Sequence, residues 1–104
     1  VDGGLTWTSA TSGLSGSAPF ISKLANSRNN PEVIFTLSSS GVFRSTDFGA
    51  SWTLTPIPTF WGSTTSTMDV EVSRANANIV WAGSRISSNG RIHVSTNGGQ
   101  TFSP

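Results

Sequence analysis

The side chains of this chain that could support catalysis are few, and the most suggestive are two acids. Asp69 and Glu71 lie two residues apart in an alternating apolar and polar run, so both belong on one face of the strand predicted over 67–72. Side chains spaced in this way are about 7 Å apart, within the range of the carboxyl pair in an inverting glycoside hydrolase. The alternative, which we favour, is a solvated strand face. Glu32 follows a predicted turn and is expected to be exposed.

His93 is the only histidine, and it lies between Ile92 and Val94 in a predicted strand. No nucleophile and no Gly-rich phosphate loop accompanies it, so we expect a hydrogen-bonded or exposed strand residue and not a catalytic base. The sequence therefore predicts no catalytic residue, no metal site and no cofactor.

Two loops carry residues that could contact a ligand. The loop 55–65 is stiffened by prolines and contains Phe60 and Trp61, an aromatic pair that could form a platform for a sugar ring or a peptide side chain. The loop 84–90 offers Arg85 and Asn89 as polar contacts. Simpler interpretations stay open: the aromatic pair could fill the gap between two sheets, and the second loop could be an insertion without a role.

The composition is that of a small globular domain with little charge. The chain has 104 residues, of which 11% are charged, whereas about 25% is typical of soluble proteins. Ser and Thr number 32, and their hydroxyl groups suit short strands joined by tight turns. The net charge of +1 is spread without a basic cluster, which predicts no nucleic-acid partner. The absence of cysteine excludes disulfides, and no apolar run is long enough to span a membrane.

One short turn recurs along the chain and defines a repeat. It is complete at 45–52 as STDFGASW, varied at 95–102 as STNGGQTF, and shortened at 1–7 as VDGGLTW. The key residue of the turn recurs after 45 and then 50 residues, and the segments 23–37 and 69–83 align without a gap. A strand-rich repeat of this length indicates the blades of a β-propeller.

Each complete repeat is expected to contain four short antiparallel strands, so the predicted fold is all-β with four-stranded propeller blades. The strands are expected at 20–25, 32–37, 42–45 and 51–54, and then at 67–72, 78–83, 91–95 and 101–103. Residues 1–104 would form a partial propeller, with the end of a preceding blade at 1–8 and blades at 20–54 and 66–104. Trp52 and Trp81 are expected in the core.

The residue types of the repeated turn explain how it could hold a hairpin together. Asp47 can accept hydrogen bonds from backbone N–H groups of the turn, Gly49 allows a positive φ, and Trp52 places a large ring between sheets. The equivalent positions in the three copies are the predicted structural residues: Asp2, Gly4, Trp7, Ser45, Asp47, Gly49, Ser51, Trp52, Ser95, Asn97, Gly99, Thr101 and Phe102.

The turn STDFGASW resembles the Asp-box, or BNR repeat, of sialidase-like, xyloglucanase-like, sortilin-like and photosystem-assembly propeller proteins. Asn97 and Phe102 depart from the pattern but keep a hydrogen-bond acceptor and a ring. The resemblance implies that these turns lie away from the substrate face and have a structural role. A sialidase-like site is disfavoured, because that family uses a tyrosine nucleophile and this chain has no tyrosine.

The chain also resembles the propeller regions of secreted Bacteroidetes-type proteins, which implies a secreted or cell-surface location. The leading expectation is a non-catalytic portion of an extracellular propeller that acts as a scaffold or as a recognition module for protein or glycan. Two alternatives stay open: a fragment of a glycoside hydrolase whose catalytic residues lie outside this chain, and a two-blade lectin that closes a ring by oligomerisation. The expected partners are the rest of a longer propeller chain or other copies of this one.

Overall fold

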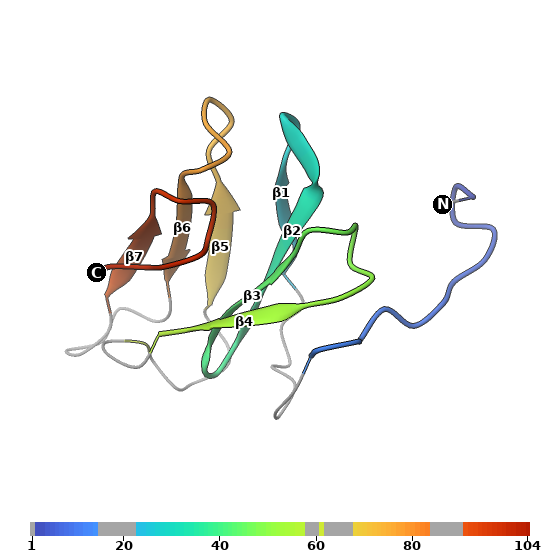
Figure 1. The fold of residues 1–104 in the computed structure, drawn as a ribbon, viewed down its shortest axis with the longest axis horizontal. Coiled ribbons are helices and arrows are strands. Elements are labelled where there is room, and N and C mark those ends of the chain that lie inside the picture. The colour runs from blue at the N-terminus through green and yellow to red at the C-terminus, as the bar shows by residue number, and fades with distance from the viewer. Residues whose placement is uncertain (1, 15–22, 58–60, 62–67, 84–90) are drawn as a thin grey trace.

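The computed structural model of the protein describes residues 2–14, 23–57, 61, 68–83 and 91–104. These residues form two antiparallel β-sheets that stand side by side, and an N-terminal arm that extends away from them (Figure 1). The fold is therefore all-β, as the sequence predicts. None of the described residues belongs to a helix that could cross a membrane.

The first sheet contains four strands hydrogen-bonded in chain order: β1 (Ala25–Ser27), β2 (Asn30–Ser38), β3 (Gly41–Ser45) and β4 (Thr53–Pro56). β-Branched and aromatic residues fill the centre of β2 and favour the extended backbone. The turn into β3 needs a glycine at position 41, where φ is 146°. A Cβ at this position would lie 2.3 Å from the carbonyl oxygen of Thr55, so no other residue fits.

The second sheet contains three strands: β5 (Asp69–Val72), β6 (Val80–Gly83) and β7 (Ile92–Ser95). After β7 the chain turns back beside it, and Ser103 forms an isolated antiparallel bridge with Val94. The two backbone hydrogen bonds of this bridge are 2.8 and 3.0 Å long. The second sheet is thus a copy of the first in which the fourth strand is reduced to one bridge.

Most strand boundaries differ from the prediction by one to three residues, and the differences are largest in the first and last strands. β1 begins at Ala25, where the predicted strand ends, because Ala25 pairs with Phe35 in the middle of β2; residues 20–22 of that prediction lie outside the described part. The strand expected at 101–103 is a single bridge, since Pro104 has no N–H to extend the pairing. Residues 2–8, expected at the end of a preceding blade, belong to no strand of the structure.

The hydrophobic core lies between the two sheets. Alternate residues of each strand point toward the other sheet, which is the period of two that a strand imposes. Each large apolar side chain that is fully buried there stabilises the fold by about 1.5–3 kcal/mol. The core residues from both sheets form one cluster, which includes Phe35, Leu37, Val42, Val70, Val72, Val80 and Ala82.

The two tryptophans expected in the core, Trp52 and Trp81, are not buried in this cluster. Trp81 is 49% exposed, contrary to the prediction, because its neighbours Val80 and Ala82 point into the core and Trp81 points to the opposite face of β6. Trp52 is partly buried, and its indole N–H donates a hydrogen bond of 2.9 Å to the carbonyl oxygen of Ala10 in the arm.

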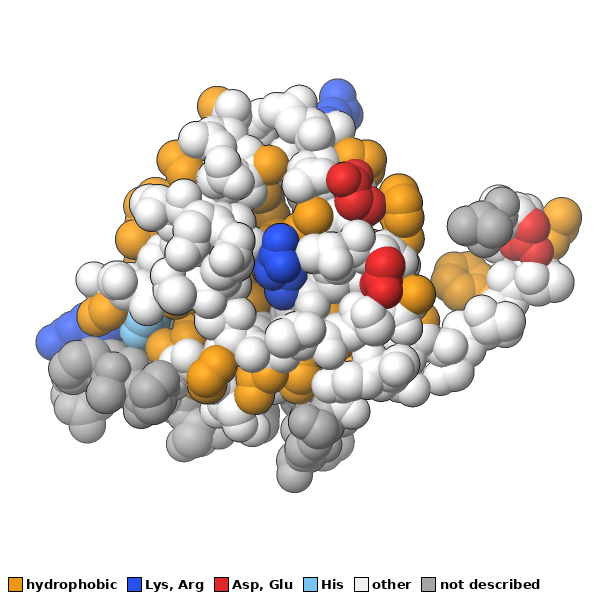
Figure 2. Space-filling view, viewed as in Figure 1, with side chains coloured by type: hydrophobic (Ala, Val, Ile, Leu, Met, Phe, Trp, Pro, Cys, Tyr) orange, Lys and Arg blue, Asp and Glu red, His pale blue; other side chains and the backbone are white. Residues whose placement is uncertain are grey.

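The surface reflects the low charge of the chain. On the face shown in Figure 2, acidic and basic side chains lie apart from one another, and hydrophobic side chains are scattered among uncharged polar groups. No extended patch of one sign of charge is visible on that face, so a charged binding site would have to be formed by a few neighbouring residues.

Candidate functional site

The turn between β3 and β4 is held by the side chains of Ser45, Asp47 and Ser51. Asp47 Oδ1 accepts hydrogen bonds of 2.8 Å from Ser45 Oγ and from the Ser51 N–H, and Asp47 Oδ2 accepts one of 2.6 Å from Ser51 Oγ. Ser45 Oγ accepts in turn from the backbone N–H groups of Asp47 and Gly49, at 3.3 and 2.8 Å. Gly49 has φ of 88° and packs against the Trp52 ring. We call this turn, and its copies at 2–7 and 95–102, the clamp turns.

The clamp turn after β7 has the same geometry with an amide in place of the carboxylate. Asn97 Oδ1 accepts from Ser95 Oγ at 2.9 Å and from the Thr101 N–H at 3.0 Å, and Ser95 Oγ accepts from the Gly99 N–H at 2.8 Å. Only one bond reverses direction: Asn97 Nδ2 donates to Thr101 Oγ1 at 2.8 Å. The turn therefore keeps its full set of hydrogen bonds with a neutral side chain.

The N-terminal clamp turn lies in the arm, away from both sheets (Figure 1). Thr6 Oγ1 donates to Asp2 Oδ2, Gly4 has φ of 87°, and Gly4 packs against the ring of Trp7. These contacts repeat those of Asp47, Ser51, Gly49 and Trp52 without any strand beside them. The local residue types are therefore sufficient to form the turn.

The second and third clamp turns are also tied to the rest of their own sheets. The Phe48 N–H donates to the carbonyl oxygen of Glu32 in β2 at 3.1 Å, and the Gly98 N–H donates to the carbonyl oxygen of Asn78, just before β6, at 2.9 Å. Phe48 and Gly98 occupy the same left-handed backbone region, with φ of 56° and 69°. This geometry suits a structural clamp, and the structural role of the clamp residues stays a prediction.

The carboxylates of the clamp turns are strongly hydrogen-bonded. The Ser51 hydroxyl, the Ser51 backbone N–H and the Ser45 hydroxyl together lower the pKa of Asp47 from 3.8 to about 2. The hydrogen bond from the Thr6 hydroxyl, with further backbone bonds, lowers the pKa of Asp2 in the same way. Both groups are therefore held in the charged form, which suits an acceptor and not a catalytic acid.

The two acids of β5 lie as the sequence predicts, on one exposed face with Val70 and Val72 buried on the other. Asp69 Oδ1 forms an ion pair of 3.0 Å with Nζ of Lys23, and this hydrogen bond raises the pKa of the lysine. Within the described part of the chain, no group of three His, Cys, Asp or Glu side chains comes together to hold a metal ion.

His93 and Trp61 meet between the sheets. His93 is buried, its Nδ1 lies 3.2 Å from the carbonyl oxygen of Arg91, and its ring meets Trp61 edge-on with centroids 5.9 Å apart. Trp61 Nε1 donates to the carbonyl oxygen of Ser38 at 3.0 Å, and the ring packs against the core. Trp61 thus occupies the space between sheets, as in the simpler interpretation of its loop. The other proposed ligand contacts lie outside the described residues: Phe60, Arg85 and Asn89.

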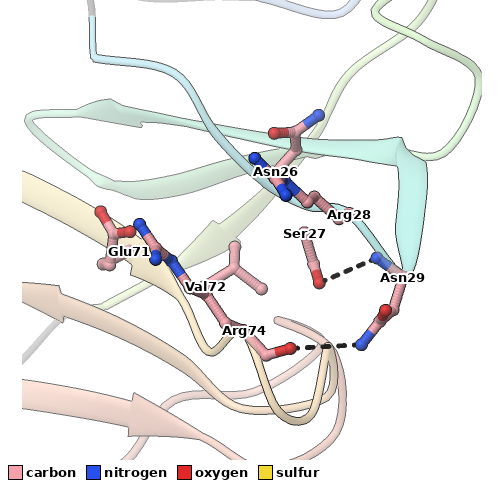
Figure 3. A pocket seen from close by; sticks show the side chains of 7 residues that line it. All are labelled: Asn26, Ser27, Arg28, Asn29, Glu71, Val72 and Arg74. Atoms are coloured by element: carbon pink, nitrogen blue, oxygen red, sulfur yellow. Dashed lines mark hydrogen bonds between the residues drawn. The ribbon is translucent and has the colours of Figure 1, made fainter.

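A pocket of about 450 Å³ opens at the seam between the sheets, beside the β1–β2 turn and the connection from β5 to β6 (Figure 3). The seam pocket, as we call it, has a mostly polar lining: Asn26, Ser27, Arg28, Asn29, Glu71, Val72 and Arg74. The two sides of the pocket are joined by a hydrogen bond of 3.2 Å from Asn29 Nδ2 to the carbonyl oxygen of Arg74. The pocket is thus built by both repeats.

Arg28 and Arg74 are the notable groups of the seam pocket. Each follows a serine at the same position of its repeat, in the aligned pairs Ser27–Arg28 and Ser73–Arg74. Among the described residues neither guanidinium has a hydrogen-bond or ion-pair partner. A guanidinium carries five N–H donors in a planar fork and binds a carboxylate through two of them. This site was not predicted from the sequence, although the recurring Ser-Arg pair is a signal that points to it.

No family model and no curated protein matches the chain. Among solved structures, the chain is similar to the crystal structure of the GH74 enzyme of Niastella koreensis, with a TM-score of 0.54 and 27% sequence identity. The similarity covers 77% of this chain but only 13% of that enzyme. The two sheets therefore resemble part of a GH74 propeller.

Proposed function

We propose that this chain is a non-catalytic portion of an extracellular propeller, and that it acts as a scaffold with a recognition site for an acidic glycan. The similarity to part of a GH74 propeller supports the scaffold. The recognition site rests on one observation, the seam pocket with its two guanidinium groups. Three of the five acids of the chain are engaged elsewhere, because Asp47 and Asp2 are held in clamp turns and Asp69 is paired with Lys23.

The chemistry of the seam pocket suits a ligand that carries both carboxylate and hydroxyl groups. Arg28 and Arg74 can bind a carboxylate, and the amides of Asn26 and Asn29 can donate to and accept from sugar hydroxyls. Glu71 adds an acceptor for a hydroxyl group. The volume lies in the range of small-ligand sites, about 300–1,000 Å³. A uronic-acid sugar meets these requirements.

The test is a calorimetric comparison of an oligogalacturonide with a neutral oligosaccharide of the same length. We expect the acidic sugar to bind more tightly, and Arg28→Gln or Arg74→Gln to weaken it about tenfold, or about 1.4 kcal/mol. Added salt should weaken binding further, because both arginines are exposed to solvent. Arg91→Gln, which changes an arginine outside the pocket, is the matched control. Equal affinity for both sugars would contradict the recognition site. So would full affinity in a variant that carries both Arg28→Gln and Arg74→Gln.

The similarity to the GH74 enzyme favours a second candidate, a portion of a glycoside hydrolase whose catalytic residues lie elsewhere in the protein. A screen for polysaccharide hydrolysis by the natural full-length protein separates the two candidates. Absence of hydrolysis supports the scaffold, and hydrolysis that survives Asp69→Asn and Glu71→Gln supports the second candidate. Hydrolysis lost in either variant would make these acids catalytic and would contradict both.

A further inference from the structure

Arg44 lies in β3, on the face of the first sheet that is turned toward the second sheet. In the strand register it pairs with Phe35 of β2 and with Thr53 of β4, and directly paired residues share a face. The second sheet covers Phe35, because its clamp turn places Gly99 on the Phe35 ring. A charged side chain therefore stands beside a contact between two sheets whose core is apolar.

The guanidinium of Arg44 has a donor that binds nothing in this part of the chain. Nε of Arg44 is buried and, among the described residues, has no hydrogen-bond partner. The ion pair that these residues form joins Lys23 to Asp69 and does not involve Arg44. Buried donors nearly always have a partner, because an unpaired donor has lost its hydrogen bonds to water without replacement. The free Nε therefore requires an explanation.

The repeat shows that the fold does not need an arginine at this position. Ser45 and Ser95 begin equivalent clamp turns, and each accepts the same hydrogen bond of 2.8 Å from the turn glycine. Arg44 comes directly before Ser45, and Val94 comes directly before Ser95. Because a valine occupies the equivalent position of β7, neither the strand nor the turn depends on a guanidinium here.

Arg44 lines a cavity of about 260 Å³ between the first sheet and the clamp turn of the second, which we call the Arg44 pocket. The lining consists of Arg44, Thr53, Leu54, Thr55, Pro56 and Gln100. Thr55 Oγ1 donates a hydrogen bond of 2.8 Å to the carbonyl oxygen of Gly99, which ties β4 to the turn that carries Gln100. None of these lining residues belongs to the seam pocket, so the Arg44 pocket is a separate site built by both repeats.

The residues of the Arg44 pocket suit a carboxylate. Nε and one terminal nitrogen of a guanidinium lie on the same edge of its plane and can donate two parallel hydrogen bonds to the two oxygens of a carboxylate. Thr53 and Gln100 are exposed and add a hydroxyl and an amide donor, while Leu54 and Pro56 offer apolar surface to the carbon atoms of an acid. The volume is below the range of about 300–1,000 Å³ for drug-sized ligands, so the acid must be small.

We propose that the Arg44 pocket binds the carboxylate group of a small organic acid through Nε and one terminal nitrogen of Arg44. The bound acid lies between β4 and the clamp turn of the second sheet, so it stabilises the contact between the two repeats. The proposal uses no residue of the seam pocket and is independent of the proposed function.

The test follows the Nε–H resonance of Arg44 by NMR while sodium acetate is added to the 104-residue chain at neutral pH. Arg44→Val, which introduces the residue found at the equivalent position 94, identifies this resonance by its loss. Sodium chloride at the same ionic strength is the matched control, because chloride screens charge but cannot accept two parallel hydrogen bonds. We expect a saturable shift of the Arg44 resonance in acetate and a shift at least tenfold smaller in chloride.

Thermal unfolding in the same two salts provides a second measurement. Acetate should raise the Tm of the wild type above its value in chloride, and this difference should vanish in Arg44→Val. It should vanish in Arg44→Lys as well, because an ammonium group keeps the charge but not the planar fork. Arg91→Gln, which changes an arginine that lines neither pocket, should keep the difference.

Three outcomes would overturn the proposal. They are an Arg44 resonance that moves equally in both salts, a resonance that does not move in acetate, and an effect of acetate on the Tm that Arg44→Val retains. Movement of the Arg28 and Arg74 resonances alone would support the seam pocket and reject the Arg44 pocket.

A further variant keeps the proposal testable if Arg44→Val does not fold. Gln100→Glu leaves Arg44 in place and adds a carboxylate at the edge of the pocket, which competes with acetate for the guanidinium. We expect the concentration of acetate that gives half of the full shift to rise about tenfold. An unchanged titration in folded Gln100→Glu would reject the site.

Discussion

Asp47 and Asn97 show what the clamp turn requires from its central side chain. In both turns one oxygen accepts from a serine hydroxyl and from a backbone N–H four residues on. The second atom of the side chain can be an oxygen that accepts or a nitrogen that donates, because the hydroxyl of Ser51 or Thr101 rotates to suit it. The requirement is thus a planar group of this length and not a negative charge.

This equivalence predicts the pH dependence of stability. The folded pKa of Asp47, about 2, lies below its unfolded value of 3.8, so the carboxylate stabilises the fold at neutral pH and loses this contribution as the pH falls through that interval. Asp47→Asn should therefore remain folded, as the Asn97 turn does, and should lose less stability than the wild type between pH about 5 and 2. Urea unfolding at several pH values measures this. Parallel curves for the two proteins would show that Asp47 is not the titrating group.

Phe48 is the residue of the clamp turn that fits its position least well. It has φ of 56°, whereas the equivalent positions hold Gly3 and Gly98, and its side chain is exposed. The left-handed backbone costs a non-glycine residue about 1–2 kcal/mol, and a glycine at position 48 would remove this strain. The greater entropy of glycine in the unfolded chain would cancel about 0.5–1 kcal/mol of the stability gained in this way.

We therefore expect Phe48→Gly to stabilise the fold by about 0.5–1 kcal/mol. Chemical denaturation of the variant beside the wild type gives the difference. Gly98→Phe is the reciprocal control and should destabilise by a similar amount. A loss of stability in Phe48→Gly would mean that the exposed ring makes a contact that outweighs its backbone strain.

At the scale of the elements, the sequence predicts which segments form strands better than it predicts the residues at which each strand begins and ends. β2, β3 and β6 follow from β-branched and aromatic runs, because such residues fill both faces of a pleated strand. The ends of the pattern were misplaced where pairing, and not residue type, decides: β1 starts at Ala25 because its partner is Phe35. The seam pocket was missed for a related reason, since Arg28 and Arg74 line one pocket only because the two sheets stand side by side.

The contact between sheets should be most sensitive at Gly99. An added methyl group would meet the Phe35 ring at 2.3 Å, and φ of 80° would strain any other residue. Gly99→Ala should therefore destabilise the fold by about 2–4 kcal/mol, whereas Gly98→Ala, with φ of 69° and only an ordinary contact of 3.5 Å between its Cβ and Asn78 Oδ1, should cost about 1–2 kcal/mol. Thermal unfolding ranks the two variants, and equal losses would show that backbone strain alone sets the cost.

At the scale of the whole molecule, the two ends of the array are unlike. The first sheet is covered on one side by the second sheet. The arm lies against the edge of the first sheet, where the backbone N–H of Trp52 donates to the carbonyl oxygen of Ser12 at 2.9 Å.

Phe35 and Trp81 are equivalent residues of the two sheets, because they pair with Arg44 and Val94, the residues directly before the clamp-turn serines. Phe35 is 1% exposed, whereas Trp81 is 49% exposed on the outer side of the second sheet. Equivalent aromatic residues therefore have different energetic roles in one chain.

This asymmetry predicts that Phe35→Ala and Trp81→Ala differ in cost. Removal of the buried Phe35 ring should destabilise the fold by about 3–5 kcal/mol, and removal of the half-exposed Trp81 ring should cost about 1 kcal/mol or less. Denaturant unfolding of the 104-residue chain measures both. Similar losses would show that the Trp81 ring is already covered in solution.

The amide at position 97 has a consequence for the electrostatics of a repeat array. A propeller that needed a carboxylate in every clamp turn would gather like charges around its rim, and their mutual repulsion would oppose the compact state. Because an amide supports the same hydrogen bonds, charge can be removed from a single turn while the clamp is kept. The net charge of such an array, and with it the solubility and the response to salt, can therefore change during evolution without a change of fold.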